Sequence, residues 1–262
     1  MSLISLCGVP GSGKTLDSTY FALKHYNKQN ILIKYYLHKF LYRIPKLKDF
    51  SRYQYFNKFP KHRINNVYSN YPILLDKKYK IYSNVVSLWD LNNDYSFEPG
   101  SIIIIDEVQL YADSDEYKDK IMNAKLSRIA KFLQAHRHYG IDTIIFTSQN
   151  PSRIFKKARN ICESYRKQEK LINIPFTPYT IMRSTDYYDL DFYGRFVPRD
   201  RKERKKLPFD YKKHFCIFNR KKVFKAYNSR YLQKYNYNKP LLTIGTYNSK
   251  IVPYERLKEL FD

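Results

Sequence analysis

The chain has 262 residues, 43% of them hydrophobic, and its 48 Lys and Arg against 24 Asp and Glu give a net charge of +24. This length and apolar content exclude a disordered chain, and no apolar run reaches the roughly 18 residues of a membrane span. The N-terminus lacks the basic segment of a signal peptide, and three widely spaced cysteines exclude a disulfide framework or a zinc cluster, so we expect a protein of a reducing cytosol.

The first motif follows an apolar run at residues 2–7 that is typical of a buried strand. Residues 8–15 read GVPGSGKT and match G-x-x-x-x-G-K-[ST], and apolar residues at helical spacing then predict a helix to about residue 28. This strand–loop–helix context predicts a phosphate-binding loop for ATP, with Lys14 at the β- and γ-phosphates and Thr15 on Mg²⁺. The predicted ATP-binding residues are Gly8, Val9, Pro10, Gly11, Ser12, Gly13, Lys14 and Thr15.

The stretch that follows the loop and its helix is less regular. Residues 31–37 (ILIKYYL) predict a second strand, and residues 81–86 predict a later one. Between them, residues 42–80 contain three prolines and many Lys, Asn and Tyr, which predicts an irregular insertion rather than part of the core.

Four isoleucines at 102–105 are followed by Asp106 and Glu107, as in a Walker B segment. A continuous β-branched run is typical of a buried parallel strand, and acids at its carboxyl end face the ligand site of an open α/β sheet. We expect Asp106 to hold Mg²⁺ and Glu107 to polarise the attacking water.

An amphipathic helix is predicted from about 118 to 139, and Gly140 is a plausible cap at its end. Residues 141–147 predict another buried strand, which ends in polar residues. Gln149 is the first choice for a group that senses the γ-phosphate or orients water, with Thr147 and Ser148 behind it. Arg137 is the first choice for an arginine finger acting on a neighbouring subunit, with the rivals Arg128 and Arg153.

Strands that alternate with helices predict an α/β fold, here a P-loop NTPase with a mainly parallel sheet and a basic C-terminal extension of short strands and helices. We expect an ATPase core at 1–160 and a basic, aromatic-rich region at 161–262.

Residues 151–262 hold 27 Lys and Arg against 11 Asp and Glu, a net +16 of the total +24. The runs RKERKK (201–206) and RKKVFK (220–225) lie near four aromatic residues and predict a nucleic-acid surface, with stacking from Phe215, Phe218, Phe224 and Tyr227.

Four strings, GVPGSGKT, IIIIDEVQ, HRHYG and IDTIIFTSQNP, together resemble the zonula occludens toxin family, which includes the assembly ATPases of filamentous phages and belongs with the FtsK- and HerA-like P-loop translocases. The resemblance covers residues 1 to about 160 and extends loosely to AYNSRY at 226–231. It implies a viral ATPase in the host cytoplasm, at or near the inner face of the membrane, that forms a homo-oligomeric ring and moves phage DNA in packaging or extrusion. Many members continue into a membrane-spanning helix, which this sequence lacks, so a separate membrane or capsid protein is an expected partner.

Two other functions stay open at this point. A P-loop nucleotide kinase would use the same loop, although the adjacent Asp106 and Glu107 favour attack by water. A basic DNA-binding structural protein with a relic nucleotide site would need none of Lys14, Thr15, Asp106 and Glu107, which are all intact.

Overall fold

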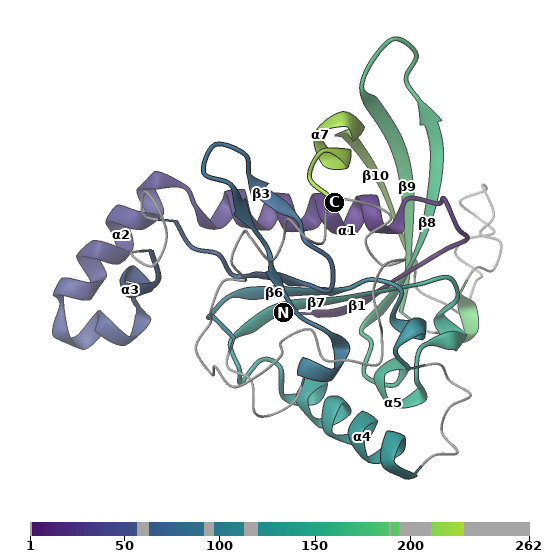
Figure 1. Ribbon diagram of the computed structural model, residues 1–262, viewed down its shortest axis with the longest axis horizontal. Helices are drawn as coiled ribbons and strands as arrows, with labels where there is room; N and C mark the ends of the chain where they lie inside the picture. Colours follow the sequence, from purple (N-terminus) through teal and green to yellow (C-terminus); the bar gives the residue numbers. More distant parts are fainter. Residues whose placement is uncertain are drawn as a thin grey trace.

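The computed structural model describes residues 2–56, 63–91, 97–112, 120–188, 190–193 and 211–227 (Figure 1). Among them, an eight-stranded sheet has the order β10-β9-β8-β1-β7-β6-β2-β5. From β8 to β5 neighbouring strands pair in parallel, and β9 and β10 add antiparallel at one edge. The strands are β1 (Ser2–Cys7), β2 (Val67–Ser69), β5 (Asn84–Val85), β6 (Ser101–Ile105), β7 (Ile141–Ser148), β8 (Ser164–Asn173), β9 (Tyr179–Tyr187) and β10 (Tyr211–Asn219). The predicted α/β fold with a mainly parallel sheet is confirmed.

Successive residues of the buried strands serve opposite faces of the sheet, because side chains alternate along a strand. Ile102 and Ile104 pack with helix α1 (Lys14–Gln29), helix α7 (Arg220–Phe224) and the small ladder of β3 (Leu74–Asp76) and β4 (Ile81–Tyr82). Ile103 and Ile105 pack on the other face, against helix α4 (Lys120–Ala135). The run of isoleucines is therefore continuous because both faces of β6 are covered.

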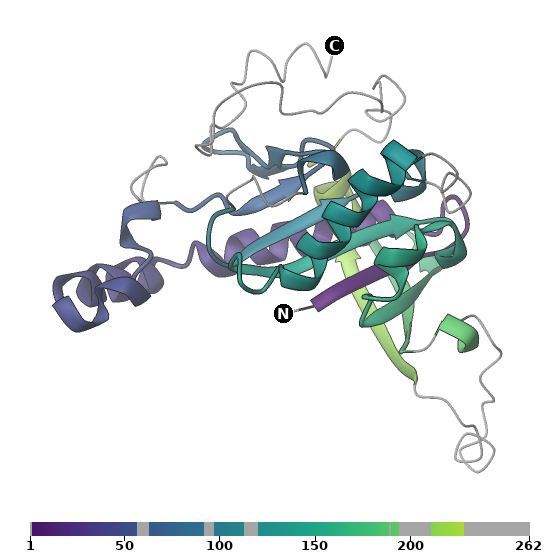
Figure 2. The same cartoon turned by 90° about the horizontal axis from the view of Figure 1, so that it is seen from below.

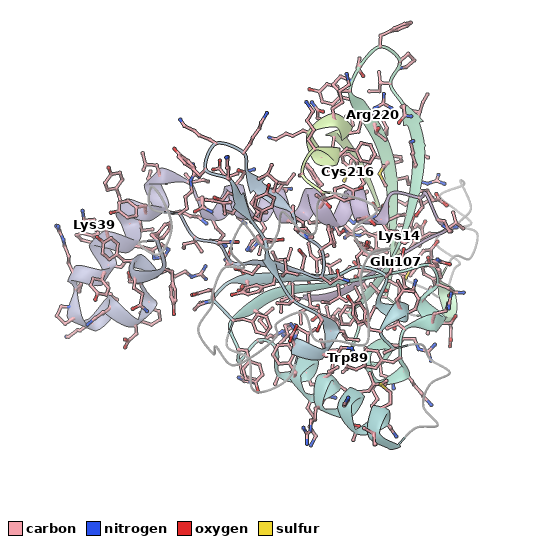
Figure 3. All side chains as sticks on the ribbon, in the orientation of Figure 1. Lys14, Lys39, Trp89, Glu107, Cys216 and Arg220 are labelled. Carbon is pink, nitrogen blue, oxygen red and sulfur yellow. The ribbon has the colours of Figure 1, made fainter. Side chains whose placement is uncertain are left out.

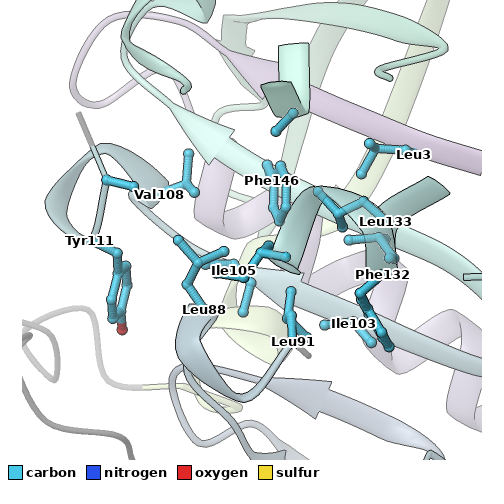
Figure 4. Close-up of a cluster of buried hydrophobic side chains, with 14 of the residues drawn as sticks. Leu3, Leu88, Leu91, Ile103, Ile105, Val108, Tyr111, Phe132, Leu133 and Phe146 are labelled. Carbon is cyan, nitrogen blue, oxygen red and sulfur yellow. The ribbon is translucent and has the colours of Figure 1, made fainter. Parts of the chain in front are cut away.

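Figure 4 shows the core on the α4 face, where Phe132 and Leu133 of α4 meet Ile103, Ile105 and Phe146 of the sheet. Helix α4 and strand β7 lie in the expected segments, but α4 ends at Ala135 and not near residue 139. Gly140, with φ +72, belongs to the turn that leads into β7 and does not cap the helix. The shorter elements are β3 (Leu74–Asp76), β4 (Ile81–Tyr82), the short helices η2 (Leu88–Asp90), η3 (Val108–Leu110), η5 (Pro151–Arg153) and η6 (Leu190–Phe192), and α5 (Lys156–Arg159). Figure 2, from below, shows α4 lying across the strands.

Two predictions for the stretch before β6 are wrong. Residues 31–37 form the start of helix α2 (Leu32–Arg43) and not a strand. Within the segment predicted as an irregular insertion, Val67–Ser69 form β2, a fully buried strand between β5 and β6 of the main sheet. The predicted strand at 81–86 divides into β4 and β5, which belong to different sheets.

Helix α2 extends from the end of α1 away from the sheet, and η1 (Pro45–Phe50) and α3 (Tyr53–Phe56) fold back beside it (Figures 1 and 2). We call residues 31–50 the α2 arm. At the other end of the molecule, β8 and β9 extend beyond the parallel strands of the sheet as a long hairpin (Figure 1). Because β8 pairs in parallel with β1, the sheet continues past residue 160, where the ATPase core was predicted to end. Across the part of the chain that the structure describes, no helix has the length and apolar character needed to cross a bilayer.

Candidate nucleotide-binding site

The loop at 8–15 connects the carboxyl end of β1 to the first turn of α1, as predicted. Gly13 has φ +92 and Gly11 has φ +78, backbone conformations that glycine adopts without steric cost. A side chain at Gly13 would also collide with Met182 of β9. The loop is thus a close-fitting backbone turn at a helix N-terminus, where N–H groups favour an anion.

Lys14 is 5% exposed and lies inside this loop. Its Nζ donates to the carbonyl oxygens of Gly8, at 2.9 Å, and of Val9, at 3.3 Å. Oε1 of Glu107 lies 3.9 Å from the same nitrogen, and Figure 3 shows the two side chains together. The structure therefore brings the predicted loop lysine and the second predicted acid to one place, although 93 positions separate them in the sequence.

Asp106 follows β6 and is held from two sides. Its carboxylate accepts hydrogen bonds from the Thr15 hydroxyl, 3.0 Å from Oδ2, and from the Thr147 hydroxyl. Asn70 fixes its backbone by accepting from the Asp106 N–H at 2.7 Å and donating to its carbonyl oxygen at 2.8 Å. Burial, together with the charge of Glu107, raises the pKa of Asp106 to about 6, against the opposing effect of the Thr147 and Thr15 hydrogen bonds and of Lys14.

Glu107 adopts a left-handed backbone conformation, with φ +50. A residue other than glycine pays for this conformation, and such strain is common at functional sites. Its N–H donates to the Thr147 hydroxyl at 2.8 Å, and its carboxylate accepts a hydrogen bond from the Gln109 amide. Thr147 therefore contacts both predicted acids, because β7 lies between β1 and β6 in the sheet.

The donor set fits a hard divalent cation. Thr15 and Asp106 offer only oxygen atoms, which are the ligands that Mg²⁺ prefers. Asp106 is a buried carboxylate whose hydrogen-bond donors, Thr15 and Thr147, are neutral hydroxyls. A nearby cation would favour its charged form, so the residues predicted to hold Mg²⁺ suit that ion.

The sequence analysis did not predict a buried chain of hydrogen bonds behind the loop. Asp17, in the first turn of α1, is buried and accepts a hydrogen bond from Gln168 of β8. Gln168 in turn accepts from the Ser184 hydroxyl of β9 at 2.9 Å. Burial raises the pKa of Asp17 to about 6, opposed by the charge of Arg166. No sequence signal links these residues, because only the pairing of β8 with β1 brings them together.

The strand-end candidates differ in position. Ser148 is buried and donates to the backbone carbonyl of Asn150 at 2.9 Å, whereas Gln149 is exposed directly after β7. Thr147, ranked behind Gln149 on sequence, is the one that contacts the acids. The sensing role of Gln149 stays a prediction.

The arginine candidates lie on the surface. Arg137 follows α4 and pairs with Glu163 at 2.8 Å, with the arginine side chain 56% exposed. Glu163 also donates its N–H to Leu3, near the start of β1, so this pair lies at the edge of the sheet opposite the loop. Arg128 is exposed on α4, and Arg153 is exposed in η5, which follows the carboxyl end of β7.

The basic C-terminal region lies only partly within the described residues. The run 201–206 is outside them, and β10 and α7 are inside. Phe215 and Phe224 are exposed, as stacking requires. Phe218 is buried and stacks on Tyr20 of α1, with ring centroids 5.3 Å apart, so its predicted availability for base stacking is wrong. Tyr227 is half-buried, with its ring 5.9 Å from that of Tyr71.

Comparison with known proteins identifies a family. The family description "Zonular occludens toxin (Zot)" matches residues 2–191. Among solved structures, the chain resembles the N-terminal domain of zonular occludens toxin from Neisseria meningitidis, with 17% identity, a TM-score of 0.41, and coverage of 87% of this chain and 98% of that one. It also resembles the genome packaging NTPase B204 of Sulfolobus turreted icosahedral virus 2 in complex with ATP-gammaS, with 16% identity, a TM-score of 0.31, and coverage of 66% and 77%. No curated protein matches. The family match spans more than half of the chain, which therefore belongs to the zonular occludens toxin family.

Proposed function

We propose that this chain is a viral or phage ATPase that couples ATP hydrolysis to the movement of genome DNA during virion assembly, packaging or extrusion. One observation carries the proposal: a complete set of P-loop and acidic side chains converges at one edge of the sheet. Thr15 lies 3.0 Å from Asp106, and Lys14 lies 3.9 Å from Glu107.

Each of these residues has a distinct role in the proposed reaction. Lys14 and the loop N–H groups bind the phosphates of ATP, and Thr15 with Asp106 holds Mg²⁺. When bound, Mg²⁺ neutralises charge on the phosphate oxygens. Glu107 orients and polarises the attacking water, and the hydrogen bonds from its own N–H to Thr147 and from Gln109 to its carboxylate hold it in position.

The described part of the C-terminal region supports a nucleic-acid partner. Lys212 on β10 and Lys221, Lys222 and Lys225 on or beside α7 are exposed, close in sequence to the exposed rings of Phe215 and Phe224. Cations attract the phosphate backbone, and aromatic faces stack on bases.

We further propose that the active form is a homo-oligomeric ring in the host cytoplasm, with a separate membrane or capsid assembly protein as its partner. The exposure of Arg137, Arg128 and Arg153 supports this arrangement, since an arginine finger must reach the site of a neighbouring subunit.

The decisive experiment measures phosphate release from ATP with and without single- and double-stranded DNA, with the mass of the protein in solution determined in parallel. We expect DNA to stimulate turnover of an oligomer, and Lys14→Ala to abolish turnover in a folded protein. Phosphate transfer to a nucleoside or nucleotide instead of water would indicate a kinase. DNA binding with no turnover by the unaltered chain would indicate a structural protein, and both results would overturn the proposal.

A further inference from the structure

The α2 arm, residues 31–50, leaves an apolar helix face uncovered. Ile33 is 75% exposed, Leu37 54% and Phe40 61%, and Leu32 and Tyr36 are exposed beside them. Residues three and four apart lie on one side of a helix, so these five side chains form a single stripe. An exposed apolar stripe of this kind marks a surface that contacts another protein or a membrane.

The opposite side of α2 is packed within the chain, which fixes the direction of the stripe. Tyr35 is buried against Phe56 and Tyr53 of the α3 segment, with ring centroids 5.6 and 5.7 Å away. The root of the arm is tied down by Asn30, which donates to the Ile64 carbonyl at 2.9 Å and accepts from the Ile64 N–H at 2.6 Å. The arm is therefore held in place by contacts within the chain. Its apolar stripe faces away from the α3 segment, on which the other side of α2 packs.

The charge of the arm restricts what can cover this stripe. Residues 28–48 contain six Lys and Arg, and no Asp or Glu lies between Asp17 and Asp49. On a helical wheel, Lys39 and Arg43 flank the stripe on one side and Lys34 flanks it on the other. Figure 3 shows Lys39 on the arm, far from Lys14 and Glu107.

We propose that the α2 arm docks on the surface of an anionic phospholipid bilayer, with the apolar stripe inserted among the acyl chains and the flanking cations at the phosphate headgroups. This combination of an apolar face and flanking Lys and Arg is typical of helices that lie in the membrane interface. DNA would satisfy the cations but gives Ile33 and Leu37 no apolar surface. A second copy would bring another chain with a net charge of +24 against a face without acids.

The test is binding of the full chain to vesicles of phosphatidylglycerol and phosphatidylcholine, measured by flotation, with phosphatidylcholine vesicles for comparison. We expect binding to the anionic vesicles, and a loss of affinity on the order of a hundredfold in a variant with Ile33→Ser, Leu37→Ser and Phe40→Ser. A variant with Lys34→Gln, Lys39→Gln and Arg43→Gln loses about a hundredfold as well, at ~1 kcal/mol per cation near the surface. The matched control, Lys125→Gln, Lys131→Gln and Lys156→Gln, removes equal charge from exposed positions elsewhere and loses far less.

A second measurement locates the contact. With Phe40→Trp, anionic vesicles should shift the added tryptophan emission to the blue, and the same change at Phe215 on β10 should leave it unshifted. All the altered side chains of the stripe are exposed, and circular dichroism with nucleotide binding confirms that each variant is folded.

Two results would overturn the proposal, and neither bears on the nucleotide site. The control charges could matter as much as those of the arm. The serine variant could float with vesicles as well as the unaltered chain, and a lower oligomer mass or weaker DNA binding in the same variant would then assign the stripe to a second copy or to DNA.

Discussion

The Glu107 carboxylate lies between Lys14 of the loop and the Gln109 amide, where β6 ends. Its contact with Lys14 is at 3.9 Å, so removal of its charge leaves the phosphate-binding atoms of the loop in place. We predict that Glu107→Gln binds ATP with nearly normal affinity and hydrolyses it slower by ~10²–10⁴-fold, the range for a general base. Equilibrium nucleotide binding and single-turnover hydrolysis measure the two effects separately.

Asp106→Ala is the matched comparison, because it removes the carboxylate that contacts Thr15 and Thr147. It should weaken Mg²⁺-dependent ATP binding as well as turnover. Equal losses of affinity in both variants would require the two acids to exchange or share their roles.

Thr147 makes a further prediction possible at the residue scale. Its hydroxyl donates to Asp106 and accepts the Glu107 N–H at 2.8 Å, whereas Gln149 is exposed. Thr147→Val preserves shape and removes both bonds, so we expect turnover to fall ~10–100-fold, as for partners that orient ligand residues. Gln149→Ala is the comparison. A larger loss in Gln149→Ala, measured as kcat with saturating ATP, would restore the first choice made from the sequence.

At the scale of elements, strands β8 and β9 support the phosphate-binding loop from beside β1. A Cβ at Gly8 would lie 3.0 Å from the backbone carbonyl oxygen of Gln168, and 2.7 Å from Oγ of Ser12, whereas one at Gly11 meets no atom within 4 Å. We predict that Gly8→Ala lowers the melting temperature and ATP affinity more than Gly11→Ala, which carries only the ~1–2 kcal/mol cost of its left-handed backbone. Thermal unfolding and nucleotide titration of both variants check the order. Equal effects would mean that β8 does not constrain the loop.

The helix α2 shows where local sequence was insufficient. A short apolar run such as 31–37 suits a strand or a helix equally, because periodicity cannot separate them at that length. The run continues to Arg43 without Gly or Pro, and Pro45 is the first residue that stops it. Packing of Tyr35 on the α3 segment, a tertiary contact, accompanies the helical conformation.

Strand β2 was missed for a different reason. Its neighbours Asn65, Asn66 and Asn70 resemble loop residues, yet all three are buried, and their amides donate to backbone carbonyl groups of other elements. Asn66 donates to the Gly100 carbonyl at 2.6 Å, for example. A pattern of apolar residues cannot reveal a strand whose burial depends on such hydrogen bonds.

The parts of the site that the sequence predicts are those joined by local motifs. Lys14 and Thr15 belong to one continuous loop, and Asp106 follows a strand that is unmistakably buried. By contrast, Gln168 and Met182 reach the loop through the pairing of β8 with β1 and of β9 with β8. The register between strands that are far apart in the sequence cannot be predicted from residue spacing or composition.

At the scale of the whole molecule, the position of Arg137 determines how it could act. The Arg137–Glu163 ion pair lies near the amino end of β1, and the loop lies at its carboxyl end. We therefore predict that Arg137 serves only the site of a neighbouring subunit. Mixing Arg137→Ala subunits with Glu107→Gln subunits should restore part of the ATPase activity, since an arginine finger supplies about 10³–10⁵ in rate. Arg153→Ala is the comparison, because Arg153 lies closer to the edge of the sheet that carries the loop. If none of Arg137→Ala, Arg153→Ala and Arg128→Ala subunits restored activity when mixed with Glu107→Gln subunits, an arginine finger in trans would be excluded.

The remaining prediction concerns DNA and the charge of the molecule. Four exposed lysines lie on or beside β10 and α7, namely Lys212, Lys221, Lys222 and Lys225. Phosphate contacts release counterions, so log affinity should fall with log salt by about 0.9 per duplex phosphate neutralised, or about 0.7 for a single strand. No sequence-reading module is recognisable, so all DNA sequences should bind alike.

Replacing these four lysines by glutamine should therefore weaken binding to every DNA sequence and lower the salt slope by about one for each lysine that contacts a phosphate. Lys202, Arg204, Lys205 and Lys206, which lie outside the described residues, should behave in the same way if the basic region acts as one surface. The control is Lys125→Gln with Lys131→Gln, which removes two exposed charges from α4 and should change the slope less. Binding isotherms at several salt concentrations give the slopes directly. A slope that the C-terminal changes leave intact, and that the α4 changes reduce, would place the DNA along α4.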